Sequence, residues 1–262
     1  MDRFELDWEG AAAEAARFIH RRVEAAGRRR GVLGLSGGID SAVTAYLAAR
    51  ALGPSRVHAL MMPYSGSSSE SLDDARAIAE DLDLPHQVID ITPMIDAYFE
   101  RWPDADRLRR ANKMARERMA ILYDQSERLD ALVIGTGNRT EALLGYTTLW
   151  GDMACAFEPI GDLYKTQVRR LAEHLGIPER IIAKPPTADL WQGQTDEGEL
   201  GFTYEMADRI LSRLVDDGMT PEQVAAEGFD EEVVRQVARR MDSSAFKRSM
   251  PPSPPLRDAA HV

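Results

Sequence analysis

Short apolar runs alternate with amphipathic segments along the first two thirds of the chain. The apolar runs predict four strands, at residues 32–35, 57–62, 87–91 and 131–135. The segments around them repeat apolar side chains every three or four positions, which predicts helices at residues 11–26, 42–49, 70–82, 106–128 and 162–176. The predicted fold class is therefore α/β, a doubly wound parallel sheet with helices on both faces and ligands beyond the carboxyl ends of its strands.

The last third of the chain follows a different pattern. From about residue 204 it is helical, with breaks near Gly218 and Gly228, which predicts a helical C-terminal region. Residues 185–201 are too polar and glycine-rich for a core segment, and we interpret them either as a mobile lid or as a plain surface connection. One domain at residues 1–250 is predicted, followed by a flexible, proline-rich tail at residues 251–262.

Composition narrows the classes of function. A formal net charge of -11 argues against a nucleic-acid partner, because binding a polyanion usually requires a basic face. No apolar run approaches the roughly 18 residues that span a bilayer, and the N-terminus lacks a signal-peptide pattern, so we expect no membrane partner. Cys155 is the only cysteine, which excludes an internal disulfide. These features predict a cytoplasmic enzyme.

The most specific motif is Ser-Gly-Gly-Ile-Asp-Ser at residues 36–41, between the first predicted strand and the next helix. Adjacent glycines let backbone amides approach an anion, and the helix N-terminus adds unpaired donors and a partial positive charge. The loop is neither a Walker A sequence nor the Gly-x-Gly-x-x-Gly of a dinucleotide-binding fold. It predicts a phosphate-binding loop, the alternative being an ordinary turn with Asp40 or Ser41 as a helix cap.

Asp40 changes the chemistry of this loop. A carboxylate would repel phosphate unless a divalent cation lay between them, so Asp40 predicts Mg²⁺ bridging to a pyrophosphate. A second acidic residue, Glu141, ends the segment Gly-Thr-Gly-Asn-Arg-Thr-Glu that follows the fourth predicted strand. Taken alone, Glu141 is equally compatible with an exposed position in the first turn of a helix. Because Mg²⁺ often takes one or two carboxylates together with substrate phosphates, we expect Asp40 and Glu141 to bind it.

The joint pattern resembles the NAD synthetase family over most of the chain. The first loop is similar to the pyrophosphatase loop of enzymes that cleave ATP into AMP and pyrophosphate. The other stretches that carry the resemblance are Asn112 with Ala-Arg-Glu-Arg-Met at 115–119, then 135–141, 164–166, Pro-Thr-Ala-Asp-Leu at 186–190, Asp-Glu-Gly-Glu-Leu-Gly at 196–201, and 246–248. The resemblance implies an adenine nucleotide alpha hydrolase-like fold and a homodimer with helices such as 106–128 at its interface.

The family's activity is the amidation of deamido-NAD, nicotinic acid adenine dinucleotide, by ATP and ammonia through an acyl-adenylate, with release of AMP and pyrophosphate. Neither step needs a nucleophilic side chain, so catalysis rests on positioning and on neutralising charge. Without the resemblance, Lys165, Arg116 and Lys247 are compatible with ordinary surface positions. By motif, the resemblance assigns to ATP the positions Gly34, Leu35, Ser36, Gly37, Gly38, Ile39, Asp40, Ser41, Thr136, Lys165 and Thr187. It assigns Arg116, Phe246 and Lys247 to deamido-NAD. It assigns Asp189 to the lid or to deprotonation of ammonia.

Three positions depart from the family pattern. Ammonia-dependent members commonly use a lysine and an aspartate toward deamido-NAD where this chain has Leu149 and Ala156, and they have a histidine in place of Phe246. The segment at 148–154 is more similar to the synthetase domain of glutamine-dependent members, yet 262 residues leave no room for a glutaminase domain. The alternatives are a subunit supplied by a separate glutaminase, amidation or adenylation of another carboxylate, and an ATP-binding regulatory module.

Overall fold

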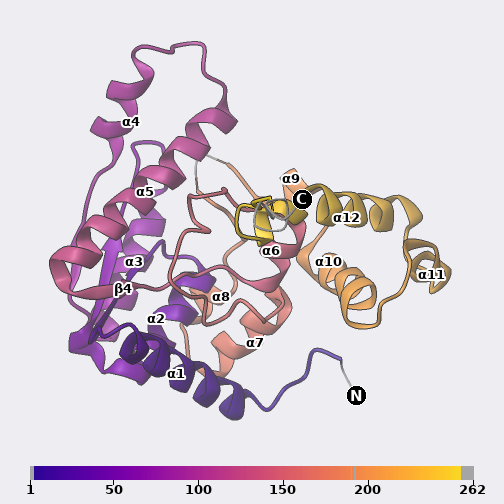
Figure 1. Ribbon diagram of the computed structural model, residues 1–262, viewed down its shortest axis with the longest axis horizontal. Coiled ribbons are helices and arrows are strands. Elements are labelled where there is room, and N and C mark those ends of the chain that lie inside the picture. Colours follow the sequence, from indigo (N-terminus) through magenta and orange to yellow (C-terminus); the bar gives the residue numbers. More distant parts are fainter. Residues whose placement is uncertain (1–2, 190, 192, 255–262) are drawn as a thin grey trace, which may run out of the picture.

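A four-stranded parallel sheet lies among the helices of the first part of the chain, and the C-terminal helices α10, α11 and α12 lie to one side of it (Figure 1). The computed structural model describes residues 3–189, 191 and 193–254. The strand order is β3-β2-β1-β4, so the chain steps outward from β1 to β3 and then crosses to the other side of β1. This topology confirms the predicted doubly wound fold. The strands are β1 (Arg30–Gly34), β2 (Val57–Met61), β3 (His86–Val88) and β4 (Ala131–Val133).

Helices cover both faces because successive strand residues point to opposite sides of the sheet. Leu33 belongs to the apolar core on one face, whereas its neighbour Val32 belongs to the core on the other. Strands buried on both faces read as continuous apolar runs, which is why the sequence pattern reveals them. The first face is covered by α1 (Trp8–Ala25), α2 (Ile39–Leu52), α3 (Ser69–Asp81) and α7 (Lys165–His174), and the second by α4 (Thr92–Phe99) and α5 (Arg107–Leu129).

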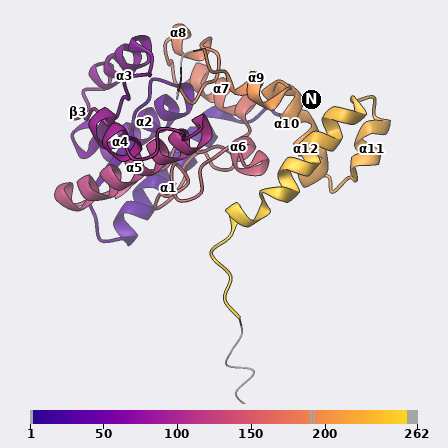
Figure 2. The ribbon, with the colours of Figure 1, turned by 90° about the horizontal axis from the view of Figure 1, so that it is seen from above.

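The C-terminal helices build a separate apolar core beside the sheet. Figure 2 shows α10, α11 and α12 extending to one side of the sheet and its covering helices. Leu144 and Tyr164 from the first part of the chain complete this core. The predicted breaks are confirmed, since Gly218 and Gly228 both have positive φ angles. The elements are α6 (Arg139–Leu144), α9 (Asp196–Leu200), α10 (Tyr204–Leu211), a π-helical turn (Ser212–Asp216), α11 (Pro221–Ala226), α12 (Glu231–Ser243) and a short 3-10 helix (Ala245–Arg248).

Four short helices lie outside the sequence predictions: α4, α6, α8 (Glu179–Ile182) and α9. α4 has eight residues and α8 has four, so neither is long enough to show a helical repeat. A 3-10 turn (Pro54–Arg56) precedes β2. β3 pairs over three residues instead of the predicted five. The other predicted helices and strands are present with shifted ends.

The prediction that residues 185–201 are too polar for a core is wrong at its C-terminal end. Residues 196–200 form α9, with the Thr195 side chain as its N-cap. Leu200 is fully buried in the C-terminal core, and Asp196 is buried as well. The polarity is misleading because hydrogen bonds can satisfy a buried carboxylate. Residues 185–189 are loop, and their motion stays a prediction.

Across the described ranges, no helix combines the length and the hydropathy that crossing a membrane requires. Residues 251–254 are exposed and irregular, and the remainder of the predicted tail, 255–262, lies outside the described residues.

Candidate active site

Two loops meet where the strand order reverses. β1 leads into α2, and its sheet neighbour β4 leads into α6. Both connections lie beyond the carboxyl ends of parallel strands, which is where open α/β sheets bind ligands. The fold thereby joins two motifs that are distant in sequence: the side chain of Asn138 contacts Asp40, 98 positions away.

The loop after β1 is shaped by its own hydrogen bonds. The N–H of Ser36 donates to Ser41 Oγ at 3.2 Å, and the Ser41 hydroxyl donates to the carbonyl of Gly38 at 2.9 Å. Gly37 has a φ of +81°, and a Cβ there would lie 2.2 Å from the carbonyl oxygen of Ser71. Conformation and space both therefore require glycine. α2 begins directly after the loop, so its first-turn amides are available to an anion.

Four side chains from α2, α7 and the start of α6 converge beside this loop. The Lys165 ammonium donates to the carboxylates of Asp40 and Glu141, the latter at 3.2 Å. Asn138 Nδ2 donates to Asp40 Oδ1 at 3.0 Å. The Lys165 side chain is 3% exposed, and those of Asp40 and Glu141 are 18% and 17% exposed. The structure thus brings together the three charged residues that the sequence assigned to Mg²⁺ and ATP.

The local sequence fixes the position of Glu141. Asn138 is the N-cap of α6, and its Oδ1 accepts the N–H of Glu141 at 3.0 Å. The Glu141 carboxylate in turn accepts the N–H of Asn138 at 3.4 Å. This reciprocal capping box turns the glutamate back toward the helix start. Glu141 does lie in a first helical turn, but facing Lys165 instead of solvent.

Burial and charge act in opposite directions within the cluster. Burial raises the pKa of Glu141 to about 8, although the Lys165 ammonium opposes this shift. Burial alone would lower the pKa of Lys165, but the charges of Asp40 and Glu141 outweigh it and the net shift is upward. Lys165 therefore stays charged, and Glu141 takes up a proton far more readily than an exposed glutamate.

Contacts with other buried residues fix the position of Lys165. The ring centroid of Tyr204 lies 5.2 Å from Lys165 Nζ, within cation–π range. The backbone N–H of Lys165 donates to Thr140 Oγ1 at 2.9 Å, and the Thr140 hydroxyl donates to Asp208 at 2.5 Å. All of these residues are buried. The structure therefore excludes the alternative that Lys165 is an ordinary surface lysine.

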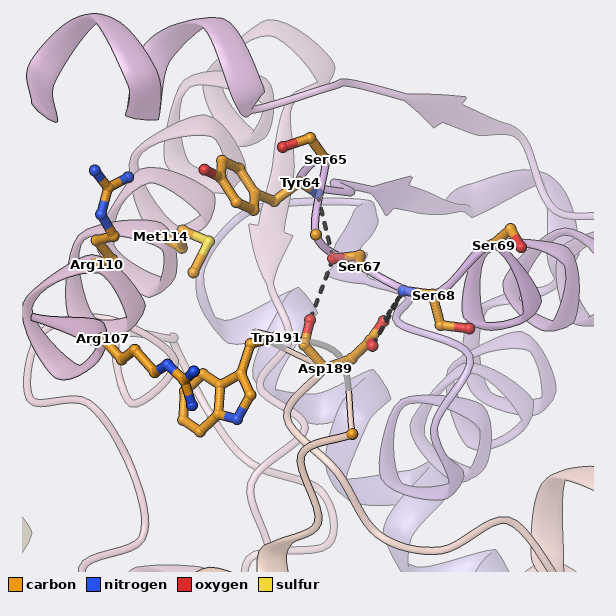
Figure 3. Close-up of a pocket in the computed structure, with 12 residues that line it drawn as sticks. Tyr64, Ser65, Ser67, Ser68, Ser69, Arg107, Arg110, Met114, Asp189 and Trp191 are labelled. Carbon is orange, nitrogen blue, oxygen red and sulfur yellow. Dashed lines mark hydrogen bonds between the residues drawn. The ribbon is translucent and has the colours of Figure 1, made fainter. Parts of the chain in front are cut away.

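A pocket of about 680 Å³ lies at the start of α3, close to the phosphate-binding loop. Figure 3 shows its walls: residues 64–69 after β2, the first turns of α5, and the segment around Asp189 and Trp191. The Asp189 carboxylate accepts the N–H of Ser68 at 3.0 and 3.1 Å, and the Ser67 hydroxyl donates to the Asp189 carbonyl at 3.2 Å. Asp189 thus ties one wall of the pocket to another. The volume is typical of a small-molecule site.

Thr136 and Thr187 border this region without joining the charged cluster. Thr136 is partly exposed in the loop after β4. Thr187 Oγ1 accepts the N–H of Asp189 at 3.0 Å. Within the described part of the chain, neither threonine forms a hydrogen bond to Asp40, Glu141 or Lys165. Their assignment to ATP stays a prediction.

Two of the three residues assigned to deamido-NAD support one loop. Arg116 on α5 donates to the carbonyl of Leu149 at 3.2 and 3.3 Å. The Lys247 ammonium donates to the carbonyls of Gly145 and Thr147 at 2.8 and 2.7 Å. Burial lowers the pKa of Lys247. The structure therefore places both basic residues at one loop, although they are far apart in sequence.

The departures from the family pattern lie near the same loop. Phe246, next to Lys247, is 61% exposed. Leu149 supplies the carbonyl that Arg116 contacts, whereas Ala156 packs against the core on the first face of the sheet. Of Phe246, Leu149 and Ala156, it is thus Ala156 that packs in an apolar core.

Sequence reasoning missed several residues around the site. The Asn-x-x-Glu spacing of a capping box was a readable signal for Asn138. The small polar run at 64–69, directly after an apolar strand, was a second readable signal, because the neighbouring loop already carries the phosphate motif. Tyr204 gave no signal, since an aromatic residue that opens a helix is ordinarily core.

Comparison with known proteins agrees with this geometry. The sequence profile of the NAD synthase family matches residues 11–251. The NH(3)-dependent NAD(+) synthetase of Fusobacterium nucleatum is 50% identical over 96% of this chain and 97% of its own length. The enzyme of the same name from Trichlorobacter lovleyi is also 50% identical, over 96% of this chain and 92% of its own length.

Solved structures show the same likeness. An NMN synthetase from Francisella tularensis has a TM-score of 0.86 at 31% identity, covering 96% of this chain and all of its own. An NH3-dependent NAD synthetase from Campylobacter jejuni has a TM-score of 0.81 at 36% identity, covering 95% of this chain and all of its own. With a profile match over nearly the whole length and two relatives at half identity, the chain belongs to the NAD synthase family.

Proposed function

We propose that the protein amidates deamido-NAD to NAD with ATP and ammonia, releasing AMP and pyrophosphate. The observation that carries the proposal is the convergence of Asp40, Glu141 and Lys165 beside a glycine loop at the sheet's switch point. The two relatives at 50% identity bear the name of this activity and match over their full lengths or nearly so. ATP is the co-substrate that this family uses.

The donor set fits Mg²⁺. Asp40 and Glu141 already share one cationic group, the Lys165 ammonium, so both carboxylates can reach a common cation. In the described ranges, no group of three or more His, Cys, Asp or Glu side chains is arranged to hold a metal ion. Mg²⁺ suits such a pair, because it takes one or two carboxylates and completes its shell with phosphate oxygens and water. When bound, it would neutralise charge on the pyrophosphate.

Groups of the chain itself would position the two substrates for both steps. A carboxylate oxygen of the substrate attacks the α-phosphorus of ATP and pyrophosphate leaves. Ammonia then attacks the acyl carbon, AMP leaves with the carboxylate oxygen, and the nitrogen releases one proton to water to give the amide. The amides at residues 36–41 and the Lys165 ammonium would hold the phosphates. Thr136 and Thr187 would complete the ATP site, and Asp189 would orient its loop. Arg116, Phe246 and Lys247 would contact deamido-NAD beside residues 145–149.

A second candidate is amidation of a pyridine mononucleotide. The Francisella tularensis relative is named an NMN synthetase and superposes with a TM-score of 0.86. Leu149 and Ala156 replace the charged pair that the family commonly uses toward deamido-NAD, which favours considering a different pyridine carboxylate. The half-identical NAD synthetases favour the dinucleotide, so we place deamido-NAD first.

The nitrogen source has an alternative as well. A glutamine-dependent NAD+ synthetase from Acinetobacter baumannii matches 95% of this chain at a TM-score of 0.66, but this chain covers only 47% of that one. A separate glutaminase could therefore supply ammonia to this chain. We propose free ammonia as the direct substrate, in keeping with the names of the half-identical relatives.

Purified protein with ATP, Mg²⁺, ammonium and deamido-NAD is expected to form NAD and AMP in equal amounts, as measured by chromatography. Nicotinic acid mononucleotide in place of the dinucleotide, and glutamine in place of ammonium, are expected to react much more slowly. Turnover with the mononucleotide alone would select the second candidate. No turnover with either pyridine carboxylate would contradict the proposal.

We also propose that the protein is a homodimer through α5. Three of its 23 residues are buried, while Leu108 and Tyr123 are 68% and 41% exposed. An exposed leucine and tyrosine on an arginine-rich helix suit an interface between copies, where aromatic residues and arginine are enriched. Sedimentation velocity is expected to give about twice the 29.1 kDa chain mass, and joint replacement of Leu108 and Tyr123 by glutamate is expected to give monomer. Val215→Glu in the C-terminal region is the control, and a wild-type monomer would contradict the proposal.

A further inference from the structure

One stretch that carries the family resemblance, residues 196–201, has no role in the site described above. Its first residue, Asp196, is 5% exposed and carries a carboxylate into the interior. Burying a carboxylate is unfavourable unless hydrogen bonds and charge partners compensate for the lost water. Three donors from three parts of the chain supply this compensation.

The first donor belongs to the segment that contains Thr187. The backbone N–H of Ala188 donates to Asp196 Oδ1 at 3.1 Å. The backbone N–H of Asp196 in turn donates to the carbonyl of Pro186 at 3.0 Å. Asp196 therefore fixes the backbone on both sides of Thr187. This pair of hydrogen bonds, called the clamp below, sets the position from which the Thr187 side chain extends.

The other two donors are tyrosine hydroxyls. Tyr204 donates to Asp196 Oδ2 at 3.1 Å. The Tyr146 hydroxyl lies 3.2 Å from Asp196 Oδ1 and 2.9 Å from Glu199 Oε2, so the two carboxylates share its one proton. Tyr204 opens α10, and its ring faces the Lys165 ammonium at 5.2 Å. Tyr146 follows α6, the helix that carries Glu141. The Asp196 carboxylate thus contacts one tyrosine that faces Lys165 and another that follows the helix carrying Glu141.

We propose that Asp196 is a positioning residue for ATP, acting through Thr187 and through the Tyr204 ring that faces Lys165. This inference rests on the proposed function, because it takes Lys165 and Thr187 as ATP ligands. Asp196 itself need not touch ATP. Its carboxylate holds two elements of the ATP site in register with each other, and misplacing such elements by about 1 Å can cost on the order of 100-fold in rate.

Two substitutions at Asp196 separate the loss of all its acceptor oxygens from the loss of its charge. Asp196→Ala removes the acceptor for all three donors. Asp196→Asn keeps an oxygen for Ala188, and the Tyr204 hydroxyl can rotate to accept from the new amide group. We therefore expect Asp196→Ala to raise the KM for ATP by about 10- to 100-fold, a range typical of outer-shell support residues, and Asp196→Asn to raise it less. A change in folded fraction alone would lower kcat and leave KM unchanged.

A direct measurement of the clamp does not depend on turnover. Hydrogen exchange of the peptide covering 185–189 is expected to be faster in Asp196→Ala than in wild type, because Ala188 loses its acceptor. Calorimetry with ATP and Mg²⁺ is expected to show weaker binding in the same variant. Tyr204→Phe tests the contribution that Asp196 makes through the Tyr204 ring, and it is expected to weaken ATP binding with less effect on hydrogen exchange. Tyr46→Phe is the matched control, since it removes a hydroxyl–carboxylate bond to Asp81 away from the site.

Unchanged exchange at 185–189 together with unchanged ATP affinity in Asp196→Ala would overturn the inference. Should that variant fail to fold, Asp196→Asn and Tyr204→Phe decide it by the same two measurements. If wild type binds ATP but amidates neither pyridine substrate, the proposed function fails while the exchange and affinity results still test Asp196.

Discussion

Asp40→Asn is expected to lower Mg²⁺-dependent pyrophosphate release by on the order of 1,000-fold, because charge stabilisation by a bound cation is worth several kcal/mol in the transition state. Asparagine preserves the shape of the side chain and an acceptor for Asn138 Nδ2, which lies 3.0 Å from Asp40 Oδ1. Glu141 also remains as a partner for Lys165. The substitution therefore removes one charge from the cluster and leaves the packing in place, so the thermal unfolding midpoint should change little.

The measurement is pyrophosphate release as a function of Mg²⁺ concentration. Asp81→Asn is the matched control, because Asp81 is an exposed aspartate at the end of α3 whose hydrogen bond to Tyr46 is remote from the loop. This control should turn over at a near wild-type rate. A purely structural Asp40 would give the opposite pattern: Asp40→Asn would unfold at a lower temperature but retain its specific activity.

Lys165→Met is expected to reduce both turnover and stability. Turnover should fall on the order of 100- to 1,000-fold, the loss typical of removing one preorganised group that stabilises developing charge. In EDTA the free energy of unfolding should fall by about 3–5 kcal/mol, because removing one partner of a buried ion pair leaves the other charge without compensation. Asp40 and Glu141 would then face each other across the position of the lost ammonium.

The stability loss in Lys165→Met is expected to depend on pH. Burial raises the folded-state pKa of Glu141 from 4.5 to about 8. A raised carboxyl pKa favours the folded state below the unfolded pKa, and this contribution is lost as pH rises through the folded pKa. Without the ammonium the folded pKa of Glu141 rises further. Both proteins lose this contribution equally between pH 4.5 and about 8, so the difference between them should be steady over that range and should widen above pH 8.

Lys184→Met is the control for this prediction. Lys184 also pairs with a buried aspartate, Asp74 of α3, at 3.0 Å, and donates to Ser71 at 3.1 Å, outside the cluster of Asp40, Glu141 and Lys165. It should lose stability while keeping turnover per folded molecule. If Lys165→Met retained wild-type turnover, Lys165 would be a structural lysine and its assignment to ATP would be wrong.

The strands and long helices could be predicted because their signals are local. Strands buried on both faces leave continuous apolar runs such as that around Val32 and Leu33, and α5 spans enough turns to show its repeat. α9 could not be predicted in this way. Its five residues are acidic and glycine-containing, and Leu200 enters the core only because α10 and α12 provide one.

The residues of the candidate site also differ in whether a local sequence pattern reveals them. The glycine loop and Asp40 were readable because the phosphate-binding requirement is met by adjacent residues, and Gly37 indeed occupies a left-handed conformation against Ser71. Glu141 was inferred as a second carboxylate for Mg²⁺, and Lys165 was assigned by resemblance. Neither their contact with each other nor the buried state of Lys165 follows from helical spacing, since they lie on different helices.

The sequence by itself determined the alternating α/β pattern, the phosphate-type loop and the family, because each is written in neighbouring residues or in the order of short motifs. Only the tertiary structure decided that Lys165 bridges Asp40 and Glu141, that Asp196 is buried, and that residues 64–69 wall a pocket. These contacts arise where the strand order reverses and the C-terminal helices pack against α6 and α7. Spatial proximity of this kind depends on how distant elements pack, and no local pattern encodes it.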